Sequence, residues 1–211
     1  FLAAWGCSAN VGITFSISGV GGSTFTDNST YTYTNDDTPY FLDLAPAPFS
    51  NRIACGIWTS DDMEAAMWTG TNWTDGEHFQ DSGDITSQIV SGTFPLSVGW
   101  LSQSNEAVFI NAEVALSGFY YSKWTGSGGW GTHTAYNPGG IGIPSSIKAL
   151  SFAGQDKVMA LIADKDTDLF IAFYNGSSWS VSNSSTAIET AIPSIYSPFT
   201  GYVFGVTALL L

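Results

Sequence analysis

The stretch Asp168-Leu-Phe-Ile-Ala-Phe-Tyr174, followed at once by Asn175-Gly-Ser-Ser-Trp179, decides the fold class. The first part is apolar and aromatic, which predicts a strand, and Asn-Gly-Ser-Ser predicts a tight turn into a second strand. Short strand signals of this kind, broken by Gly, Asn, Asp and Pro, fill the rest of the chain, and helix signals are nearly absent. We therefore predict an all-β fold.

The strand pattern repeats with a period of about 49 residues. Pro95, Pro144 and Pro193 are spaced 49 apart, and so are Trp130 and Trp179. Two residue types that share one period indicate structural repeats, and each repeat holds four strand-sized segments. We expect N-terminal strands in residues 1–45 and repeats at 46–94, 95–143, 144–192 and, as a partial unit, 193–211.

The partial unit ends on an apolar strand, residues 206–211, and an uncovered apolar edge invites aggregation. The N-terminal strands would complete this unit within one molecule, closing a ring, or complete it in a neighbour, building a filament. The third alternative is that the natural chain continues beyond Leu211.

Three tracts place a tryptophan after a glycine turn: Gly70-Thr-Asn-Trp73, Gly126 through Trp130, and Gly176-Ser-Ser-Trp179. Together with the strand before each turn, they resemble the blades of sialidase-like and lectin-like β-propellers. The resemblance covers about residues 46–211. It implies a fold of four-stranded blades and carries no activity by itself.

The resemblance does not extend to sialidase chemistry. Trp68 and Tyr174 stand where the sialidase Asp-box would place its aspartate, and Arg52 alone cannot form the arginine triad that holds the substrate carboxylate. His78 and His133 are the two histidines, and neither is near a nucleophile motif such as Gly-x-Ser-x-Gly. The obvious carboxylates lie in turns, so we expect a protein that is not an enzyme.

The charge balance excludes several partners. Five Lys and Arg against eighteen Asp and Glu give a formal net charge of −13, whereas nucleic-acid binding needs a basic surface. No apolar run approaches the roughly 18 residues that span a bilayer. An acidic chain with few charged residues is suited to an extracellular or cell-surface location, which we expect here.

Aromatic side chains are the candidate ligand-binding groups. A tryptophan combines a large apolar face with one N–H, which suits a sugar ring. Trp73, Trp130 and Trp179 recur once per repeat, so we expect them to pack between units. Trp68, Trp124 and Tyr174 end the preceding strands; they are the candidate ligand contacts, and we expect Trp68 and Trp124 to be exposed.

A turn with alternating carboxylates is the candidate metal site. Asp164, Asp166 and Asp168 could together bind a hard cation such as Ca²⁺, although Leu169 follows where calcium loops have a glycine. The alternative is a solvated hairpin loop. A second acidic tract could hold a metal or form a charged insertion loop: Asp75, Glu77, His78, Asp81 and Asp84. No other cofactor is indicated.

Covalent features suit a secreted protein. Cys7 and Cys55 form one disulfide or remain two buried thiols. Four Asn-x-Ser/Thr sequons are candidate glycosylation sites: Asn28, Asn72, Asn175 and Asn183.

Two functions from different classes follow from these observations. The first is a structural surface protein, such as a subunit of a filament, sheath or virion, whose partners are copies of itself or other surface proteins. The alternative is a carbohydrate-binding, lectin-like module whose partners are glycans. A fragment of a glycoside hydrolase is the third hypothesis.

Overall fold

The computed structural model describes residues 2–7, 10–18, 25–31, 39, 41–59, 62–79, 94–113, 116–126, 128–166, 168–182 and 187–188. Within these ranges the elements are β-strands, so the prediction of an all-β fold is confirmed. None of the described elements is a helix long and apolar enough to cross a membrane.

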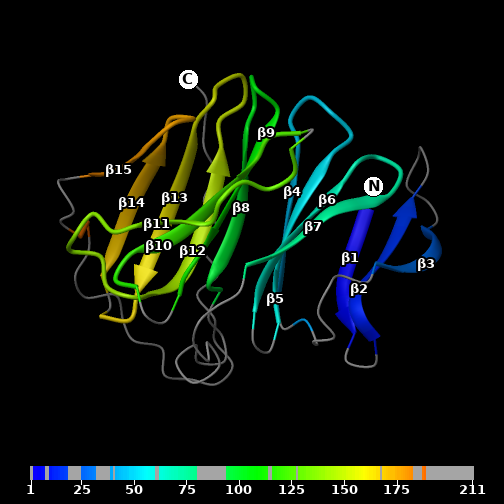
Figure 1. Cartoon of the computed structure of the whole chain (residues 1–211), viewed down its shortest axis with the longest axis horizontal. Coiled ribbons are helices and arrows are strands. Elements are labelled where there is room, and N and C mark those ends of the chain that lie inside the picture. Colours follow the sequence, from blue (N-terminus) through cyan, green and yellow to red (C-terminus); the bar gives the residue numbers. More distant parts are fainter. Residues whose placement is uncertain are drawn as a thin grey trace.

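The strands form antiparallel sheets that lie side by side in chain order (Figure 1). The N-terminal sheet has three strands: β1 (Leu2–Cys7), β2 (Asn10–Ser18) and β3 (Phe25–Tyr31). Blade 1 has four strands: β4 (Phe41–Pro46), β5 (Ile53–Trp58), β6 (Met63–Trp68) and β7 (Trp73–Phe79).

Blades 2 and 3 repeat this four-stranded arrangement. Blade 2 consists of β8 (Leu96–Leu101), β9 (Glu106–Asn111), β10 (Phe119–Trp124) and β11 (Thr134–Tyr136). Blade 3 consists of β12 (Pro144–Ser151), β13 (Val158–Asp164), β14 (Leu169–Tyr174) and β15 (Trp179–Val181). Each strand pairs with its neighbour in sequence, which is the arrangement predicted for propeller-type units.

The strand registers define equivalent positions in the three blades. Trp68, Trp124 and Tyr174 each end a third strand, opposite Ile53, Ala107 and Val158 at the start of the second strand. A tight turn then leads to a tryptophan, which begins the fourth strand in blades 1 and 3 and precedes it in blade 2. The turns contain Gly70, Gly126 and Gly176, whose φ angles of 103°, 85° and 92° lie in a region that favours glycine.

The core lies between the sheets rather than within one of them. One apolar cluster joins blades 1 and 2, a second joins blades 2 and 3, and a third covers the side of blade 1 toward the N-terminal sheet. Trp73, Trp130 and Trp179 are buried in these clusters. The prediction that these three residues pack between units is therefore confirmed.

The first strand of each blade is the innermost, and it packs against the first strand of the next blade. β8 contacts both β4 and β12. Gly99 in β8 also allows close packing on the second strand of blade 3, because a Cβ atom there would lie 2.9 Å from a methyl carbon of Val158 in β13. The space at Gly56 in β5 is equally small, because a Cβ atom there would lie 2.8 Å from a methyl carbon of Leu96.

The N-terminal strands form their own sheet beside blade 1. β1 contacts β4, and Phe15 of β2 packs edge-on against Trp68 and Trp73, with ring centroids 5.4 and 6.0 Å away. The sheet of blade 1 begins at Phe41, so it includes residues that the repeat spacing assigned to the tract 1–45. The partial unit 193–211 lies outside the described residues, so its completion by N-terminal strands stays a prediction.

Candidate functional site

The third strand of each blade ends at a junction with the preceding sheet. Trp68, Trp124 and Tyr174 occupy this position, and their exposed fractions are 4%, 2% and 4%. The expectation that Trp68 and Trp124 are exposed is therefore wrong. The physical reason is the neighbouring sheet, whose side chains cover each ring. A direct contact between these rings and a ligand stays a prediction.

At the junction of blades 1 and 2, Asp75 of β7 reaches the ring of Trp124. Its Oδ2 atom accepts a hydrogen bond of 2.9 Å from the indole nitrogen. The register of β6 and β7 shifts between Ala65 and Met67, so Asp75 and Gly76 together oppose Ala66 in a β-bulge. Asp75 has a φ of 50° within this bulge. Bulges of this kind redirect side chains, here toward the next blade.

Arg52 approaches the same indole from blade 1. Its guanidinium carbon lies 4.9 Å from the centroid of the Trp124 ring, within cation–π distance. No hydrogen bond or ion pair joins this guanidinium to any residue that the structure describes. The N–H donors of Arg52 therefore have no partner within that part of the chain, and the half-buried side chain faces solvent as well as the ring.

Together these residues form the candidate site, which we call the Trp124 site: Arg52, Asp75 and Trp124. Arg52 offers donors, and the exposed carboxylate of Asp75 has a second oxygen, Oδ1, that can accept. Within the part of the chain that the structure describes, neither Arg52 nor Asp75 is a member of an ion pair, so both charges can interact with a ligand. Trp124 holds the two groups in place rather than offering a free face.

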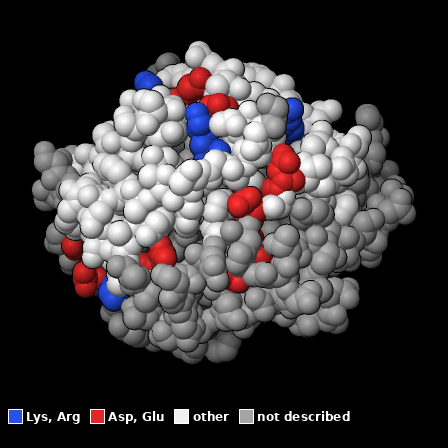
Figure 2. All heavy atoms as spheres, viewed as in Figure 1, with Lys and Arg blue, Asp and Glu red and all other residues white. Residues whose placement is uncertain are grey.

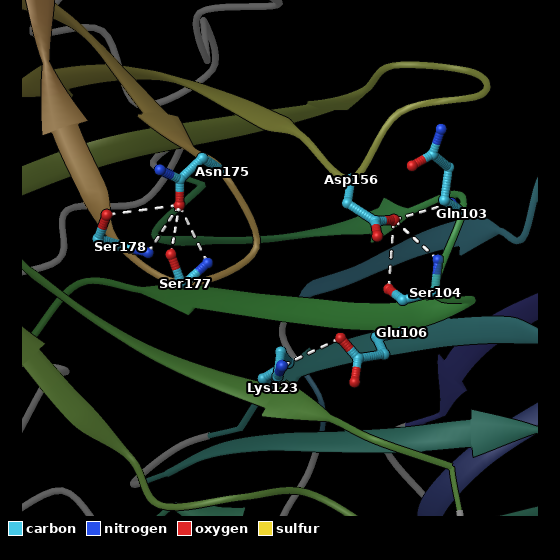
Figure 3. A network of polar contacts seen from close by, with 8 residues as sticks. All are labelled: Gln103, Ser104, Glu106, Lys123, Asp156, Asn175, Ser177 and Ser178. Atoms are coloured by element: carbon cyan, nitrogen blue, oxygen red, sulfur yellow. Dashed lines mark hydrogen bonds and ion pairs between the residues drawn. The ribbon is translucent and has the colours of Figure 1, made fainter.

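The junction of blades 2 and 3 has a different composition. Glu106 occupies the position equivalent to Arg52, and Tyr174 replaces Trp124. Lys123 donates a hydrogen bond of 3.0 Å to Glu106 (Figure 3). Burial, with smaller contributions from Tyr121 and Glu106, raises the pKa of Tyr174 to about 12. The Tyr174 ring packs against Tyr121 at 5.7 Å.

Turns at the same end of blades 2 and 3 are joined by polar contacts (Figure 3). Asp156 of blade 3 accepts hydrogen bonds from the backbone nitrogens of Gln103 and Ser104, each of 2.8 Å. In the next turn, Asn175 Oδ1 accepts from Ser177 and Ser178. The Asp156 contacts fix how blades 2 and 3 are spaced, and the Asn175 contacts shape the turn before Trp179.

A second polar network links the innermost strands. Asp43, Ser97 and Lys148 occupy equivalent positions in β4, β8 and β12. Asp43 Oδ2 accepts from the Val98 nitrogen at 3.0 Å, and Ser97 Oγ accepts from the Ala149 nitrogen at 2.9 Å. Lys148 donates to Asp43 Oδ1 at 2.9 Å, so one carboxylate connects three blades.

Two carboxylates of the candidate calcium turn lie close to one point, because a Cβ atom at Gly142 would be 2.7 Å from Asp166 Oδ2 and 2.9 Å from Asp164 Oδ2. Asp164 Oδ1 accepts hydrogen bonds from the backbone nitrogens of Asp166 and Asp168, and Oδ2 accepts from that of Gly142. Burial is the main cause of the raised pKa of Asp164. The described residues contain no group of three His, Cys, Asp or Glu placed to hold a metal ion. Asp164 therefore stabilises the turn, and Ca²⁺ binding stays a prediction.

The other candidates are placed as follows. Cys55 is a free, buried thiol. The side chain of Cys7 lies outside the described part, so the expectation of two buried thiols stays a prediction. Asn72 and Asn175 are exposed in turns, Asn28 is in β3, and Asn183 is not described. Glycosylation of these residues stays a prediction.

Sequence reasoning did not assign a role in carbohydrate binding to Arg52 or Asp75. The chain has one arginine, and that scarcity was the available signal for Arg52. Asp75 stood in an acidic tract considered for metal binding, and its bulge has no clear sequence signature. Asp75 and Trp124 are 49 residues apart in the sequence, but they are not equivalent positions: Trp124 corresponds to Trp68 at the end of the third strand, and Asp75 lies in the fourth strand of the preceding blade.

Solved structures share this arrangement of sheets. Aleuria aurantia lectin in complex with alpha-methyl-L-fucoside matches with a TM-score of 0.58 at 13% identity, over 92% of this chain and 57% of that chain. BP39L lectin from Burkholderia pseudomallei matches with a TM-score of 0.53 at 11% identity, over 81% and 47%. SapL1 lectin in complex with alpha methyl fucoside matches with a TM-score of 0.53 at 17% identity, over 82% of this chain and 55% of that chain.

These similarities identify the fold as a β-propeller. Aleuria aurantia lectin has a six-bladed propeller, and this chain spans less than two thirds of the length of each lectin. The sialidase NanB matches as well, with a TM-score of 0.51 at 12% identity, over 81% of this chain and 27% of that chain. The propeller resemblance is thus confirmed. No protein-family model and no curated protein matches the chain.

Proposed function

We propose that this chain is a carbohydrate-binding propeller module and that glycans bind at the Trp124 site. The observation that carries the proposal is the arrangement of Arg52 and Asp75 around one indole. A cation whose donors have no partner among the described residues and a carboxylate with a second acceptor oxygen, both from blade 1, lie against an indole of blade 2. The similar lectins bind fucosides, so the same fold serves sugar binding elsewhere.

The chemistry of the site favours sugar hydroxyl groups. A hydroxyl both donates and accepts, so neighbouring hydroxyls of one ring can accept from Arg52 and donate to Asp75. Hydrogen bonds to charged groups contribute about 1.5–3 kcal/mol each. The site is pre-organised, because the cation–π contact holds Arg52 and the indole hydrogen bond holds Asp75. Little side-chain entropy is then lost on binding.

The net charge of −13 favours an uncharged ligand over an anionic one. The basic side chains visible on the face in Figure 2 lie close to acidic ones, and most of the described surface there is uncharged. An anionic sugar would be repelled by Asp75 itself. We therefore expect neutral glycans, displayed outside a cell, and propose an extracellular or cell-surface location.

The structural-subunit hypothesis has less support. It was motivated by absent catalytic groups, few charges, sequons and an unpaired strand in residues 206–211. That strand lies outside the described residues, and the lectin similarities favour carbohydrate binding. The hydrolase hypothesis needs two carboxylates on either side of the sugar, and the Trp124 site as defined contains one, Asp75.

A glycan array followed by calorimetry tests the proposal. The wild-type chain should bind neutral glycans, and Arg52→Ala and Asp75→Asn should each weaken binding about 10–100-fold, as expected for the loss of one charged hydrogen bond. Lys157→Ala is the matched control, because Lys157 is the blade 3 equivalent of Arg52. An array without signal, or equal binding by both site variants, would refute the proposal.

A further inference from the structure

The turn that carries Arg52 also displays an aromatic ring to solvent. This turn, residues 47–52, joins β4 to β5, ends at Arg52 and has Phe49 near its tip. Phe49 is 70% exposed, whereas the other exposed large apolar side chains of the described chain, Phe173 and Ile188, are 39% and 45% exposed. Phe49 belongs to none of the three apolar clusters of the described blades, so packing in the core does not account for its ring.

The backbone of this turn is held by several contacts. The Ala47 nitrogen donates to the Arg52 carbonyl oxygen at 2.9 Å, which closes the turn, and Pro48 restricts the backbone before Phe49. Ser50 Oγ donates to Asn105 Oδ1 at 3.1 Å, in the turn between β8 and β9. The tip of the turn therefore contacts blade 2, the blade that carries Trp124. A ring on a backbone held in this way loses little conformational freedom when it contacts a ligand.

Phe49 lies on the central side of the Trp124 site. In blade 1 the innermost strand is β4 and the outermost is β7, so the turn from β4 to β5 is closer to the centre than Asp75 in β7. Along the blade the order is Asp75, then Arg52, then Phe49. The Cα atoms of Phe49 and Arg52 are three peptide units apart, so at most about 11 Å separates them. Two linked sugar rings can extend over such a distance, whereas one ring held by Arg52 and Asp75 cannot.

The fold of the turn does not itself require an aromatic residue. The turn of blade 3, residues 152–157, also has six residues, and the Phe152 nitrogen closes it by donating to the Lys157 oxygen at 3.3 Å. Its third residue is Gly154, which corresponds to Phe49. The phenylalanine is therefore a feature of the turn beside Arg52, and its solvent-exposed ring is available to a ligand.

We infer that Phe49 binds the apolar face of a second sugar residue, so that the ligand of the Trp124 site is a neutral disaccharide or a longer glycan. The inference rests on the proposed function. Arg52 and Asp75 offer hydrogen bonds to hydroxyl groups, and the Trp124 ring is 2% exposed, so it cannot receive the C–H face of a sugar. Phe49 supplies that aromatic face, whose negative potential attracts C–H groups.

Calorimetry with two sizes of ligand tests this inference. The probes are the methyl glycoside of the neutral sugar that binds tightest in the array and the disaccharides that extend this sugar at each hydroxyl. In the wild type we expect at least one disaccharide to bind about 3–10-fold tighter than the methyl glycoside. Phe49→Ala should reduce this ratio to below about twofold, and Phe49→Trp should keep it. Phe173→Ala is the matched control, because it removes an exposed aromatic ring from β14 of blade 3.

The outcomes separate the two claims. If the wild type binds the methyl glycoside and no disaccharide binds tighter, the role of Phe49 is refuted and carbohydrate binding stands. The same holds if Phe49→Ala keeps the wild-type ratio, or if Phe173→Ala lowers the ratio as much as Phe49→Ala does. Equal thermal midpoints of the variants and the wild type verify that each variant is folded. If neither the methyl glycoside nor any disaccharide binds, the proposed function fails, and the inference fails with it.

Discussion

The carboxylate of Asp75 and the indole nitrogen of Trp124 are 2.9 Å apart and belong to adjacent blades. The contact satisfies an N–H group that is buried with its ring, since Trp124 is 2% exposed. It also holds Asp75 in the left-handed region of backbone space, where asparagine and aspartate are better tolerated than most residues. One side chain thus contributes to the stability of the junction and to the candidate site.

Asp75→Ala and Asp75→Asn should separate these two roles. The alanine leaves the indole N–H without its acceptor and suits a φ of 50° poorly, so we expect a loss of about 1–3 kcal/mol in unfolding free energy. The asparagine keeps a carbonyl acceptor and should remain within about 0.5 kcal/mol of the wild type. Urea unfolding measures both values, and equal stability of the two variants would contradict this account.

Ser97→Ala should destabilise the inner strands. The hydroxyl accepts from the Ala149 nitrogen and donates to Asp43, so its removal leaves a buried backbone N–H without a partner. The expected cost is about 1–3 kcal/mol in urea unfolding. Ser104→Ala is the control, because the Ser104 hydroxyl is exposed and its 3.2 Å hydrogen bond should contribute little. A cost for Ser97→Ala no larger than that of the control would be evidence against the inner network.

Gly99→Ala should be destabilising, and Val158→Ala should partly rescue it. A Cβ atom at Gly99 would lie 2.9 Å from Val158, and overpacking of this kind costs about 1–3 kcal/mol. Removing the methyl groups of Val158 makes room for the added atom, so the double variant should be more stable than the sum of the single losses implies. A double-mutant cycle measures this coupling, and strict additivity would show that the blades are not in contact there.

His133 should make stability sensitive to acid. Burial lowers its pKa from 6.5 to about 4, partly offset by Glu113, and its Nε2 atom lies 2.7 Å from Asn111 Oδ1. Since the pKa is lower in the folded state, the unfolded state binds more protons between pH 6.5 and 4. The contribution of neutral His133 to the unfolding free energy is therefore fully present above about pH 6.5 and is lost as the pH falls toward 4.

The variant His133→Gln tests this pH dependence, because glutamine keeps a donor for Asn111 and does not titrate. Unfolding free energies measured at pH 7 and pH 4.5 should differ less in the variant than in the wild type. Other acidic groups change both proteins equally, so the difference between them isolates His133. The same pH dependence in both proteins would refute the contribution of this residue.

The fold was predictable because the repeat imposes the same constraint on each blade. A tight turn needs a glycine, and the junction needs a large ring, so a Gly followed by a Trp recurs in each blade, three residues apart in blades 1 and 3 and four apart in blade 2. The predicted boundary of the first repeat at residue 46 falls at the end of β4, whereas the boundary at residue 144 falls at the start of β12. The spacing of residues in the sequence does not show whether a given position begins or ends a strand.

The site was less predictable, because it depends on which side chains meet across a junction. Trp124 has a ligand-like sequence context, yet its burial follows from Arg52 and Asp75 of the preceding blade. The direction of Asp75 follows from a bulge that alters the register at a single position. Neither the contacts across the junction nor the bulge produces a periodic pattern in the sequence. Similarly, Asp164 belongs to a run of alternating carboxylates that is typical of metal sites, yet its oxygens accept hydrogen bonds from backbone nitrogens.

The most direct test of carbohydrate binding is an NMR titration of the wild-type chain and of Asp75→Asn with the tightest neutral glycan from the array. The signal to follow is the indole ¹H–¹⁵N resonance of Trp124, assigned by its loss in Trp124→Phe. The account predicts a saturable shift of this resonance in the wild type and an affinity at least about tenfold weaker in Asp75→Asn. A resonance that does not move while other signals saturate would contradict it, because the glycan would then bind away from the Trp124 site.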